Sequence, residues 1–465
     1  MCPELVYVPP PMKKLFGTDG IRGTANVYPM TGEMAMTLGR ASAHVFKHKV
    51  GQHRIVIGKD TRVSGYMIES ALTSGICSFG VDVLILGHLP TPAVAFLTRS
   101  LRADAGIMIS ASHNPFEDNG IKFFSKDGQK LPDAMELEIE RLIVSKDIDH
   151  IRPTAHDIGK AHRVFDAEGR YIEFAKNSLP KGLDFQGLKI VVDCGNGAAY
   201  KVAPMALMEL GAEVIVLNNF PDGVNINHNC GALHPSDLQT AVLYHHADIG
   251  IAHDGDADRT VIVDEKGKVV SGESVLVAFA QQLHENKNLV GNTVVTTEHS
   301  NKGMERTLRK SGIRVIRTHV GDRYVLEAML SGGYNFGGES SGHVIFLDHN
   351  TTGDGLITAL QFLSLMKQTG RTVSHLTGET VLFPQSSVNI KVKDKIPLSN
   401  IPQLQQTIDE YKFALNGSGN LLVRYSGTEK VLRIMVEGED KTVIATMAKA
   451  LSAIVEKEIG MTKEA

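Results

Sequence analysis

The amino-acid sequence predicts an α/β protein in which three similar mixed-sheet α/β domains and a C-terminal α+β domain surround a central cleft. Two observations carry this prediction. Short, β-rich apolar runs alternate with longer helix-like segments, and three groups of such runs each end in a polar loop. In addition, a chain of 465 residues is too long for one ordinary core and long enough for three or four domains.

Each group contains three apolar runs of strand length, and the third run ends in SASHNP, DGDADR or GESSGH. Open α/β sheets bind ligands at the carboxyl ends of their strands, so three loops in equivalent places are expected to face one cleft. Chance repetition of strand–helix alternation is the alternative. The runs lie at 54–60, 81–87, 104–110, then 188–197, 212–218, 247–256, and finally 292–300, 313–319, 334–343.

The composition changes beyond about residue 373, where prolines, polar strand-like stretches and a last helix near 441–457 indicate a smaller α+β domain. This domain has its own loop, RYSGTE at 424–429. The predicted domains are residues 1–155 with SASHNP, 156–258 with DGDADR, 259–373 with GESSGH, and 374–465 with RYSGTE.

The composition of the chain gives no indication of a nucleic-acid or membrane partner. Hydrophobic residues make up 42% and charged residues 22%, as in ordinary globular proteins, and a net charge of −4 gives no sign of a nucleic-acid partner. No run reaches the roughly 18 apolar residues of a membrane span, and the N-terminus lacks the apolar core of a signal peptide. The four cysteines show no C-x-x-C spacing and read as free thiols. We therefore expect a cytoplasmic protein with no nucleic-acid or membrane partner.

The loop DGDADR predicts a metal site. Asp254, Asp256 and Asp258 alternate directly after an apolar run, and their carboxylates can converge if the backbone curls around an ion. Oxygen-only ligation suits Mg²⁺ or another hard cation. Arg259 follows and could bind a phosphate oxygen at the same place.

Two other interpretations of this loop exist. A solvated acidic turn is the simpler one. An EF-hand would use the same three aspartates with Glu265 at its twelfth position, but Arg259 stands where that loop requires glycine. Strand-like sequence also flanks the loop where helices should be, so the EF-hand interpretation is rejected.

The segment ISASHNPFEDNGIKFF at 109–124 predicts an exposed turn that carries a reactive serine. Ser112 follows a strand-like run, and His113 and Pro115 come soon after it. A serine in such a turn can attack a phosphoryl group or carry one. The negative charge of a phosphoserine needs positive charges nearby, which the aspartate-bound metal and Lys122 could supply. A hydroxyl that merely caps the turn is the alternative.

The third loop, GGESSGH, offers side chains suited to hydrogen-bonding the hydroxyls of a polyol: Glu339, Ser341 and His343. It also matches the G-x-S-x-G nucleophile elbow of hydrolases. That elbow must lead into a helix, whereas strand-like HVIFL follows here, so we reject a hydrolase.

Two further loops carry arginine. RYSGTE has the groups of a phosphate cradle, although a surface turn with incidental arginines is the alternative. LFGTDGIRG at 15–23 presents Arg22, but it lacks the glycine spacing and the place of a nucleotide loop. The groups proposed for the cradle are Arg424, Ser426, Gly427, Thr428 and Arg433.

Five motifs in order, FGTDGIRG, SASHNP, DGDADR, GESSGH and RYSGTE, run from about Lys14 to about Glu437. This string resembles the phosphohexomutase superfamily, and most closely its bacterial phosphoglucosamine mutase branch. VGDRYV at 320–325, PDGVNIN and NCGALHP favour the glucosamine branch over the mannose/glucose branch. Lys430, where the family commonly has proline, and ALHP in place of STHP depart from the pattern.

The resemblance implies four domains around a cleft, one Mg²⁺ per subunit and a phosphoserine at Ser112. The implied metal ligands are Ser112, through its phosphate, with Asp254, Asp256 and Asp258. The catalytic candidates are Ser112, the general acid/base Lys122, Arg22, Arg259 and His113. The substrate-binding candidates are Glu339, Ser341, His343, Arg323, Arg424, Ser426, Gly427, Thr428 and Arg433.

The implied reaction interconverts glucosamine 6-phosphate and glucosamine 1-phosphate through a 1,6-bisphosphate, with a bisphosphorylated sugar as activator. It would feed UDP-N-acetylglucosamine synthesis and thus peptidoglycan precursors. Lys122 would exchange the sugar hydroxyl's proton, with its pKa lowered by neighbouring cations. The alternatives are a phosphomannomutase/phosphoglucomutase of the same superfamily, a sugar phosphatase, or a non-catalytic binder of sugar phosphates. The partner is a small phosphosugar, and a homodimer is compatible with the sequence.

Overall fold

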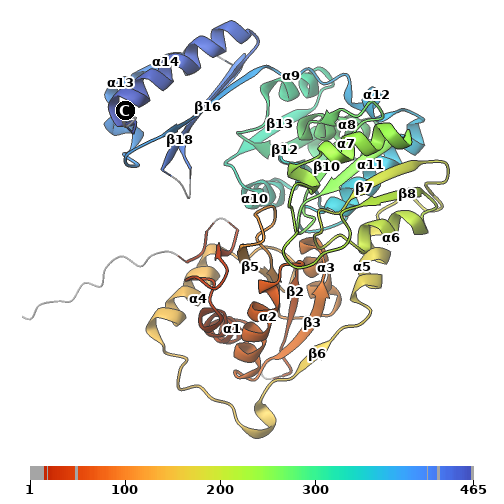
Figure 1. Ribbon diagram of the computed structural model, residues 1–465, viewed down its shortest axis with the longest axis vertical. Helices are drawn as coiled ribbons and strands as arrows, with labels where there is room; N and C mark the ends of the chain where they lie inside the picture. Colours follow the sequence, from red (N-terminus) through yellow and green to blue (C-terminus); the bar gives the residue numbers. More distant parts are fainter. Residues whose placement is uncertain (1–14, 18, 48–50, 416, 427–429, 462–465) are drawn as a thin grey trace, which may run out of the picture.

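The computed structural model describes residues 15–17, 19–47, 51–415, 417–426 and 430–461. These residues form four sheets with helices packed on them, arranged in chain order (Figure 1). In this part of the chain, no helix has the length and apolar character needed to cross a membrane.

The first sheet has the strand order β1-β5-β4-β2-β3-β6. Its last strand, β6, pairs in parallel with β3, so this sheet continues past the predicted boundary between residues 155 and 156. The strands are β1 (Ile21–Thr24), β2 (Arg54–Lys59), β3 (Asp82–His88), β4 (Ala105–Ile109), β5 (Asp118–Ser125) and β6 (Ala161–Arg163), and the helices are α1 (Gly32–Phe46), α2 (Ser64–Cys77), α3 (Thr91–Ser100) and α4 (Asp133–Ser145).

The second sheet has the order β11-β10-β9-β7-β8. Its strands are β7 (Lys189–Asp193), β8 (Glu213–Leu217), β9 (Ile249–His253), β10 (Thr260–Val263) and β11 (Val269–Val270), and its helices are α5 (Ala167–Lys176), α6 (Val202–Glu209) and α7 (Ser236–His245).

The third sheet has the order β13-β12-β14-β15. Its strands are β12 (Thr293–Thr297), β13 (Arg314–Thr318), β14 (Phe336–Gly338) and β15 (Val344–Phe346), and its helices are α8 (Gly272–Glu285), α9 (Lys302–Lys310), α10 (Asp322–Gly332), α11 (Gly355–Thr369) and α12 (Val373–Thr377).

The three sheets repeat one arrangement. In each sheet the first strand of the repeat lies between the second and the third, all three parallel: β4-β2-β3, β9-β7-β8 and β14-β12-β13. A fourth strand then returns antiparallel beside the third: β5, β10 and β15. The parallel strands are joined by helices, whereas the antiparallel return needs only a loop. SASHNP, DGDADR and GESSGH occupy these three loops, which confirms the predicted repeat.

The C-terminal domain is an antiparallel sheet of order β16-β18-β17 covered by two helices. It is an α+β domain as predicted, although of the two helices the sequence predicts only the last. In Figure 1 it stands apart from the other sheets at the blue end of the chain. Its elements are β16 (Gln385–Lys391), α13 (Pro402–Leu415), β17 (Gly419–Tyr425), β18 (Val431–Gly438) and α14 (Lys441–Ile459).

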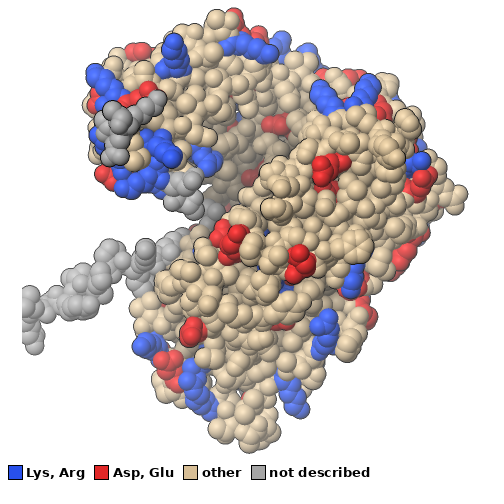
Figure 2. All heavy atoms as spheres, viewed as in Figure 1, with Lys and Arg blue, Asp and Glu red and all other residues tan. Residues whose placement is uncertain are grey.

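Packing divides the molecule into two parts. One buried apolar cluster takes side chains from all of the first three domains, among them Phe124, Ile190 and Phe336. The C-terminal domain has a separate core, which includes Leu404, Ile434 and Leu451. A shared core fixes the loops SASHNP, DGDADR and GESSGH relative to one another. Figure 2 shows a hollow between this body and the C-terminal lobe, whose Lys and Arg side chains gather near it.

Candidate active site

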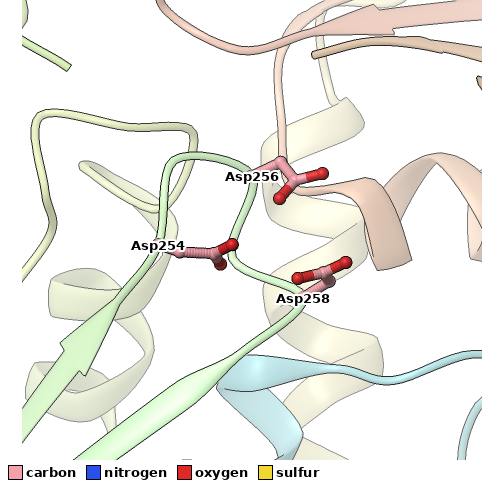
Figure 3. Close-up of side chains that lie close together, drawn as sticks. All are labelled: Asp254, Asp256 and Asp258. Carbon is pink, nitrogen blue, oxygen red and sulfur yellow. The ribbon is translucent and has the colours of Figure 1, made fainter. Parts of the chain in front are cut away.

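The aspartate loop between β9 and β10 brings three buried carboxylates together. Asp254, Asp256 and Asp258 each offer an oxygen within 4.8 Å of the others, and Figure 3 shows the three side chains gathered from one tight loop. Burial, with the negative charges of Asp258 and Asp256, raises the pKa of Asp254 well above its usual value. Burial alone would also raise the pKa of Asp258, but His343, Lys122 and Arg259 lower it.

The aspartate loop has the free acceptors that a cation requires. Oδ1 of Asp256 and Oδ1 of Asp258 are buried and accept no hydrogen bond from the described residues. Oδ2 of Asp256, by contrast, accepts hydrogen bonds from Thr91 Oγ1 at 2.6 Å and from Lys122 Nζ at 2.7 Å. These partners hold the carboxylate while its other oxygen stays open. An oxygen-only set of this kind fits Mg²⁺.

The loop between β4 and β5 presents Ser112 to the aspartates. Ser112 Oγ donates a hydrogen bond to Asp254 Oδ2 at 2.7 Å and lies 3.2 Å from His113 Nδ1. Its backbone φ is 55°, in the left-handed region that favours glycine. The serine hydroxyl and the candidate metal site are therefore adjacent, as the sequence predicts.

The sequence motifs do not predict the residues that hold this serine in place. Arg62, which is fully buried, donates to the carbonyls of Ser112 and Asn114 and pairs with Asp60. Asn227 Nδ2, from the second domain, donates to the same two carbonyls at 2.9 and 3.1 Å. The signal in the sequence is position: Asp60 ends the first strand-like run, and Asn227 ends PDGVNIN.

Lys122 lies beside the aspartate loop, as the sequence predicts, but the described groups around it shift its pKa in the direction opposite to the predicted one. Burial alone would lower its pKa, yet the carboxylates of Asp19, Asp256 and Asp258 outweigh burial and raise it above the ordinary value. Lys122 Nζ lies 2.7 Å from Asp256 and 3.1 Å from Asp19. The sequence predicts that cations dominate around Lys122, whereas carboxylates dominate among the described groups.

Arg22, Arg259 and His113 also reach this place. Arg22 pairs with Asp19. Arg259 Nη1 lies 3.2 Å from His113 Nδ1. Burial, with the positive charges of Arg259 and Arg22, lowers the pKa of His113 to about 4, so its imidazole is neutral at neutral pH.

The GESSGH loop between β14 and β15 contributes His343, Glu339 and Ser341. His343 is buried, and its Nδ1 lies 3.6 Å from Asp258 Oδ2. Burial alone would lower the pKa of His343, but Asp258, Asp322 and Glu339 raise it to about 9. Ser341 Oγ donates to Glu339 Oε2 at 3.3 Å. Because β15 is a strand, the nucleophile-elbow interpretation is excluded as expected.

Arg323, by contrast, lies among carboxylates of the seam between the first and third domains. Its guanidinium is 2.7 Å from Asp133, 3.0 Å from Glu327 and 3.6 Å from Glu136. The VGDRYV motif therefore brings a different residue, Asp322, toward the site, where it lies 3.4 Å from His343 Nε2.

The predicted phosphate cradle is only partly described. Gly427 and Thr428 lie outside the described residues. Arg424 on β17 and Arg433 on β18 are directly opposite each other in the antiparallel pair. Like charges in that position are unfavourable unless an anion accompanies them. Burial and these two arginines lower the pKa of His299, so a loop of the third domain approaches the pair. Ser426 donates its N–H to the carbonyl of Val431 at 2.8 Å.

Comparison with known families matches all four domains. Models of the phosphoglucomutase/phosphomannomutase alpha/beta/alpha domains I, II and III match residues 13–149, 169–267 and 271–381, and the model of the C-terminal domain matches 388–454. The chain belongs to the phosphohexomutase superfamily. The order of the five motifs and the repeated sheet topology follow from this membership.

Named relatives refine the position within the phosphohexomutases. A phosphoglucosamine mutase of Geobacter metallireducens is 58% identical over 449 residues, covering 97% of this chain and 100% of the relative. One from Syntrophotalea carbinolica is 55% identical over 454 residues, covering 97% and 99%. This phosphohexomutase is therefore an enzyme of the isomerase class, related over nearly its full length to phosphoglucosamine mutases.

Solved structures share the fold. A phosphoglucomutase/phosphomannomutase family protein from Burkholderia thailandensis superposes with a TM-score of 0.79 at 25% identity, covering 96% of this chain and 99% of that one. An N-acetylphosphoglucosamine mutase of Aspergillus fumigatus, in complex with GlcNAc-6P and magnesium, gives 0.66 at 16% identity, with 95% of both chains covered.

Proposed function

We propose that this phosphohexomutase interconverts glucosamine 6-phosphate and glucosamine 1-phosphate, with Ser112 as the phosphoryl carrier. The observation that carries the proposal is the 2.7 Å hydrogen bond between Ser112 Oγ and Asp254, inside a loop whose other carboxylates have open oxygens. The choice of glucosamine phosphate as the substrate rests on relatives named phosphoglucosamine mutase, which are 53–58% identical to this chain.

The proposed chemistry transfers one phosphoryl group in each half of the reaction. Phosphorylated Ser112 gives its phosphoryl group to the free O1 or O6 of the sugar, and that hydroxyl loses its proton. The product of this step is a 1,6-bisphosphate and an unmodified serine. Ser112 then attacks the other phosphate, the sugar oxygen regains a proton, and the phosphoserine is restored. A bisphosphorylated sugar would likewise recharge a serine that has lost its phosphate.

Each group around Ser112 has a role in this proposal. Asp254, Asp256 and Asp258 would hold one Mg²⁺, which supplies positive charge to the oxygens of the transferring group. Arg22 and Arg259 would stabilise the negative charge of the phosphoryl group. Lys122 would give and take the proton of the sugar hydroxyl, while neutral His113 lies beside Ser112 Oγ.

The remaining candidates would hold the sugar. Glu339, Ser341 and His343 would bind its hydroxyls from the third domain. The like-charged pair on β17 and β18, with Ser426, Gly427 and Thr428, would hold the phosphate that is not being transferred. Between the two halves of the reaction, the bisphosphate must turn end for end, so each phosphate would occupy this cradle in turn.

Two alternatives use the same groups. A phosphomannomutase/phosphoglucomutase would share the Ser112 chemistry and differ in the sugar. A sugar phosphatase would release inorganic phosphate, but it has little use for a second phosphate cradle in a separate domain. We further propose that the product serves UDP-N-acetylglucosamine synthesis. We also propose that the protein forms a homodimer, which light scattering on the purified protein would test.

One assay tests the proposed function. Purified protein is given glucosamine, glucose and mannose phosphates in turn, with a 1,6-bisphosphate activator and Mg²⁺. We expect glucosamine 1-phosphate and 6-phosphate to interconvert without release of inorganic phosphate. Release of phosphate at the rate of substrate loss would make the protein a phosphatase and overturn the proposal.

A further inference from the structure

An ion pair that crosses from the first domain to the third domain ends close to the proposed catalytic groups. Lys130 lies just after β5, and its Nζ is 2.6 Å from Asp322 Oδ2 and 2.8 Å from Asp322 Oδ1. Asp322 is the first residue of α10 in the third domain. Figure 1 shows the chain that follows β5 approaching α10. Both side chains are largely buried, with 13% and 16% of their surface exposed.

The same ammonium group also holds Asp19. Lys130 Nζ donates to Asp19 Oδ1 at 2.6 Å. The other oxygen of this carboxylate, Oδ2, pairs with Arg22 and lies 3.1 Å from Lys122 Nζ. Burial alone would raise the pKa of Asp19, but Lys122, Lys130 and Arg22 lower it well below its usual value, so the carboxylate stays charged. Asp19 thus connects Lys130 to two proposed catalytic cations.

A second ion pair at this seam lacks that connection. Arg323 of the third domain lies 2.7 Å from Asp133 of the first domain, whose side chain is 68% exposed. The other printed ion pairs of Arg323 lead to Glu136, which is buried, and to Glu327, which is exposed, and none of them involves Asp19. Docking the two domains therefore does not by itself require the buried pair.

We propose that Lys130 is a positioning residue. When the first and third domains are docked, it holds the side chains of Lys122 and Arg22 in place through Asp19. With Asp322 in place, Lys130 is held from the third domain and fixes one oxygen of Asp19. The other oxygen is then directed at Lys122 and Arg22. A small displacement of groups that act on the transferring phosphate slows the chemical step strongly. This proposal rests on the proposed function, because it is measured through turnover.

The test compares four purified full-length variants with the wild type: Lys130→Met, Asp322→Asn, the double variant, and Asp133→Asn as the matched control at the same seam. We expect Lys130→Met to lower kcat at least about tenfold while KM changes by less than about threefold. Asp133→Asn should keep kcat within about twofold, because Asp133 is 68% exposed and solvent screens its interaction with Arg323. Wild-type turnover in the same assay tests the proposed function separately.

The double variant separates positioning from stability. Lys130→Met leaves Asp322 buried without its ammonium partner, so Tm should fall, and neutralising Asp322 as well should restore most of that loss. Asp322 also lies 3.4 Å from His343, so the double variant is compared with Asp322→Asn. If Lys130 positions Asp19, kcat of the double variant stays below that of Asp322→Asn although Tm recovers. Recovery of kcat together with Tm would overturn the proposal, and so would an equal loss of kcat in Asp133→Asn. Should Lys130→Met fail to fold, the double variant against Asp322→Asn gives the same comparison.

Discussion

Ser112 is the residue at which local strain, contacts and chemistry meet. A serine with φ of 55° is costly in isolation and persists only where surrounding contacts hold it. Here Arg62 and Asn227 both bind its carbonyl oxygen, and its own N–H donates to Ser110 Oγ at 2.9 Å. Contacts from two domains thus fix the hydroxyl beside Asp254.

Replacing Ser112 by alanine removes the proposed carrier and little else. We expect Ser112→Ala to lose nearly all mutase activity while Tm stays close to that of the wild type, because the described partners of its hydroxyl are Asp254 and His113 of the candidate site. Intact-mass measurement should find one phosphate on active wild-type protein and none on the variant. Ser125→Ala, at the end of the same hairpin, is the control and should keep both activity and phosphate. Full activity of Ser112→Ala would refute the carrier role.

Asp256 shows how one carboxylate can serve both the protein and an ion. Its Oδ2 is held by Thr91 and Lys122, while its Oδ1 is buried and accepts no hydrogen bond from the described chain. We expect Asp256→Asn to weaken Mn²⁺ binding, measured directly by titration, at least about tenfold. EDTA should abolish turnover by the wild type, and Mg²⁺ should restore it.

The control for the metal experiment is Asp237→Asn, an exposed aspartate at the start of α7 in the same domain. It should bind Mn²⁺ as the wild type does. If chelated wild type keeps its rate, or if Asp256→Asn binds Mn²⁺ normally, the loop is structural and the metal assignment fails.

At the scale of secondary-structure elements, the register of β17 and β18 supports the role proposed for the C-terminal domain. Two arginines 9 positions apart in RYSGTE and its continuation become direct cross-strand neighbours because the loop between them reverses the chain. Two guanidinium groups on adjacent strands can bind one phosphate together.

Arg424→Ala should therefore weaken binding of the phosphate that is not transferred. A charge-assisted hydrogen bond contributes about 1.5–3 kcal/mol, so KM should rise about ten- to a hundredfold in both directions of the reaction. The control is Arg306→Ala, an exposed residue that pairs with Glu439 beside the same domain. An unchanged KM in both directions would remove the cradle from substrate binding.

The sequence predicts elements well where local pattern decides and poorly where distant residues meet. Strand-like runs such as 54–60 and 188–197 became β2 and β7, and the loops after the third strands lie where the repeat places them. The raised pKa of Lys122 could not be predicted, because Asp19, Asp256 and Asp258 come from distant parts of the chain. Nor could the place of β6, whose three exposed residues carry no apolar signal.

At the scale of the whole molecule, the apolar clusters distinguish two units: one cluster joins the first three domains, whereas the C-terminal domain has a cluster of its own. The first three domains share one core, so the serine, the aspartates and the GESSGH loop form a fixed assembly. The C-terminal domain is joined to the third domain by polar contacts, including Lys302 N–H to Glu437 at 2.6 Å and Asn420 to the carbonyl of Glu298 at 2.8 Å. Small polar seams favour relative motion of domains, which suits a cleft that must release and rebind a turning intermediate.

The choice of sugar is a property of this whole cleft, since the phosphate cradle and the hydroxyl-binding loop lie in different domains. An amine and a hydroxyl at C2 differ by one protonatable group, and the Glu339 carboxylate could accept a hydrogen bond from either. Sites built on hydrogen bonds reject ill-fitting analogues more strongly than apolar pockets do.

We predict that kcat/KM for glucosamine phosphate exceeds that for glucose or mannose phosphate by at least about tenfold, or roughly 1.4 kcal/mol. Kinetics on the three sugars with the same activator measure it. The control is Ser112→Ala, which should be inactive on all three. Equal or better use of mannose phosphate would assign the chain to the phosphomannomutase/phosphoglucomutase branch, and the chemistry proposed for Ser112 would remain in place.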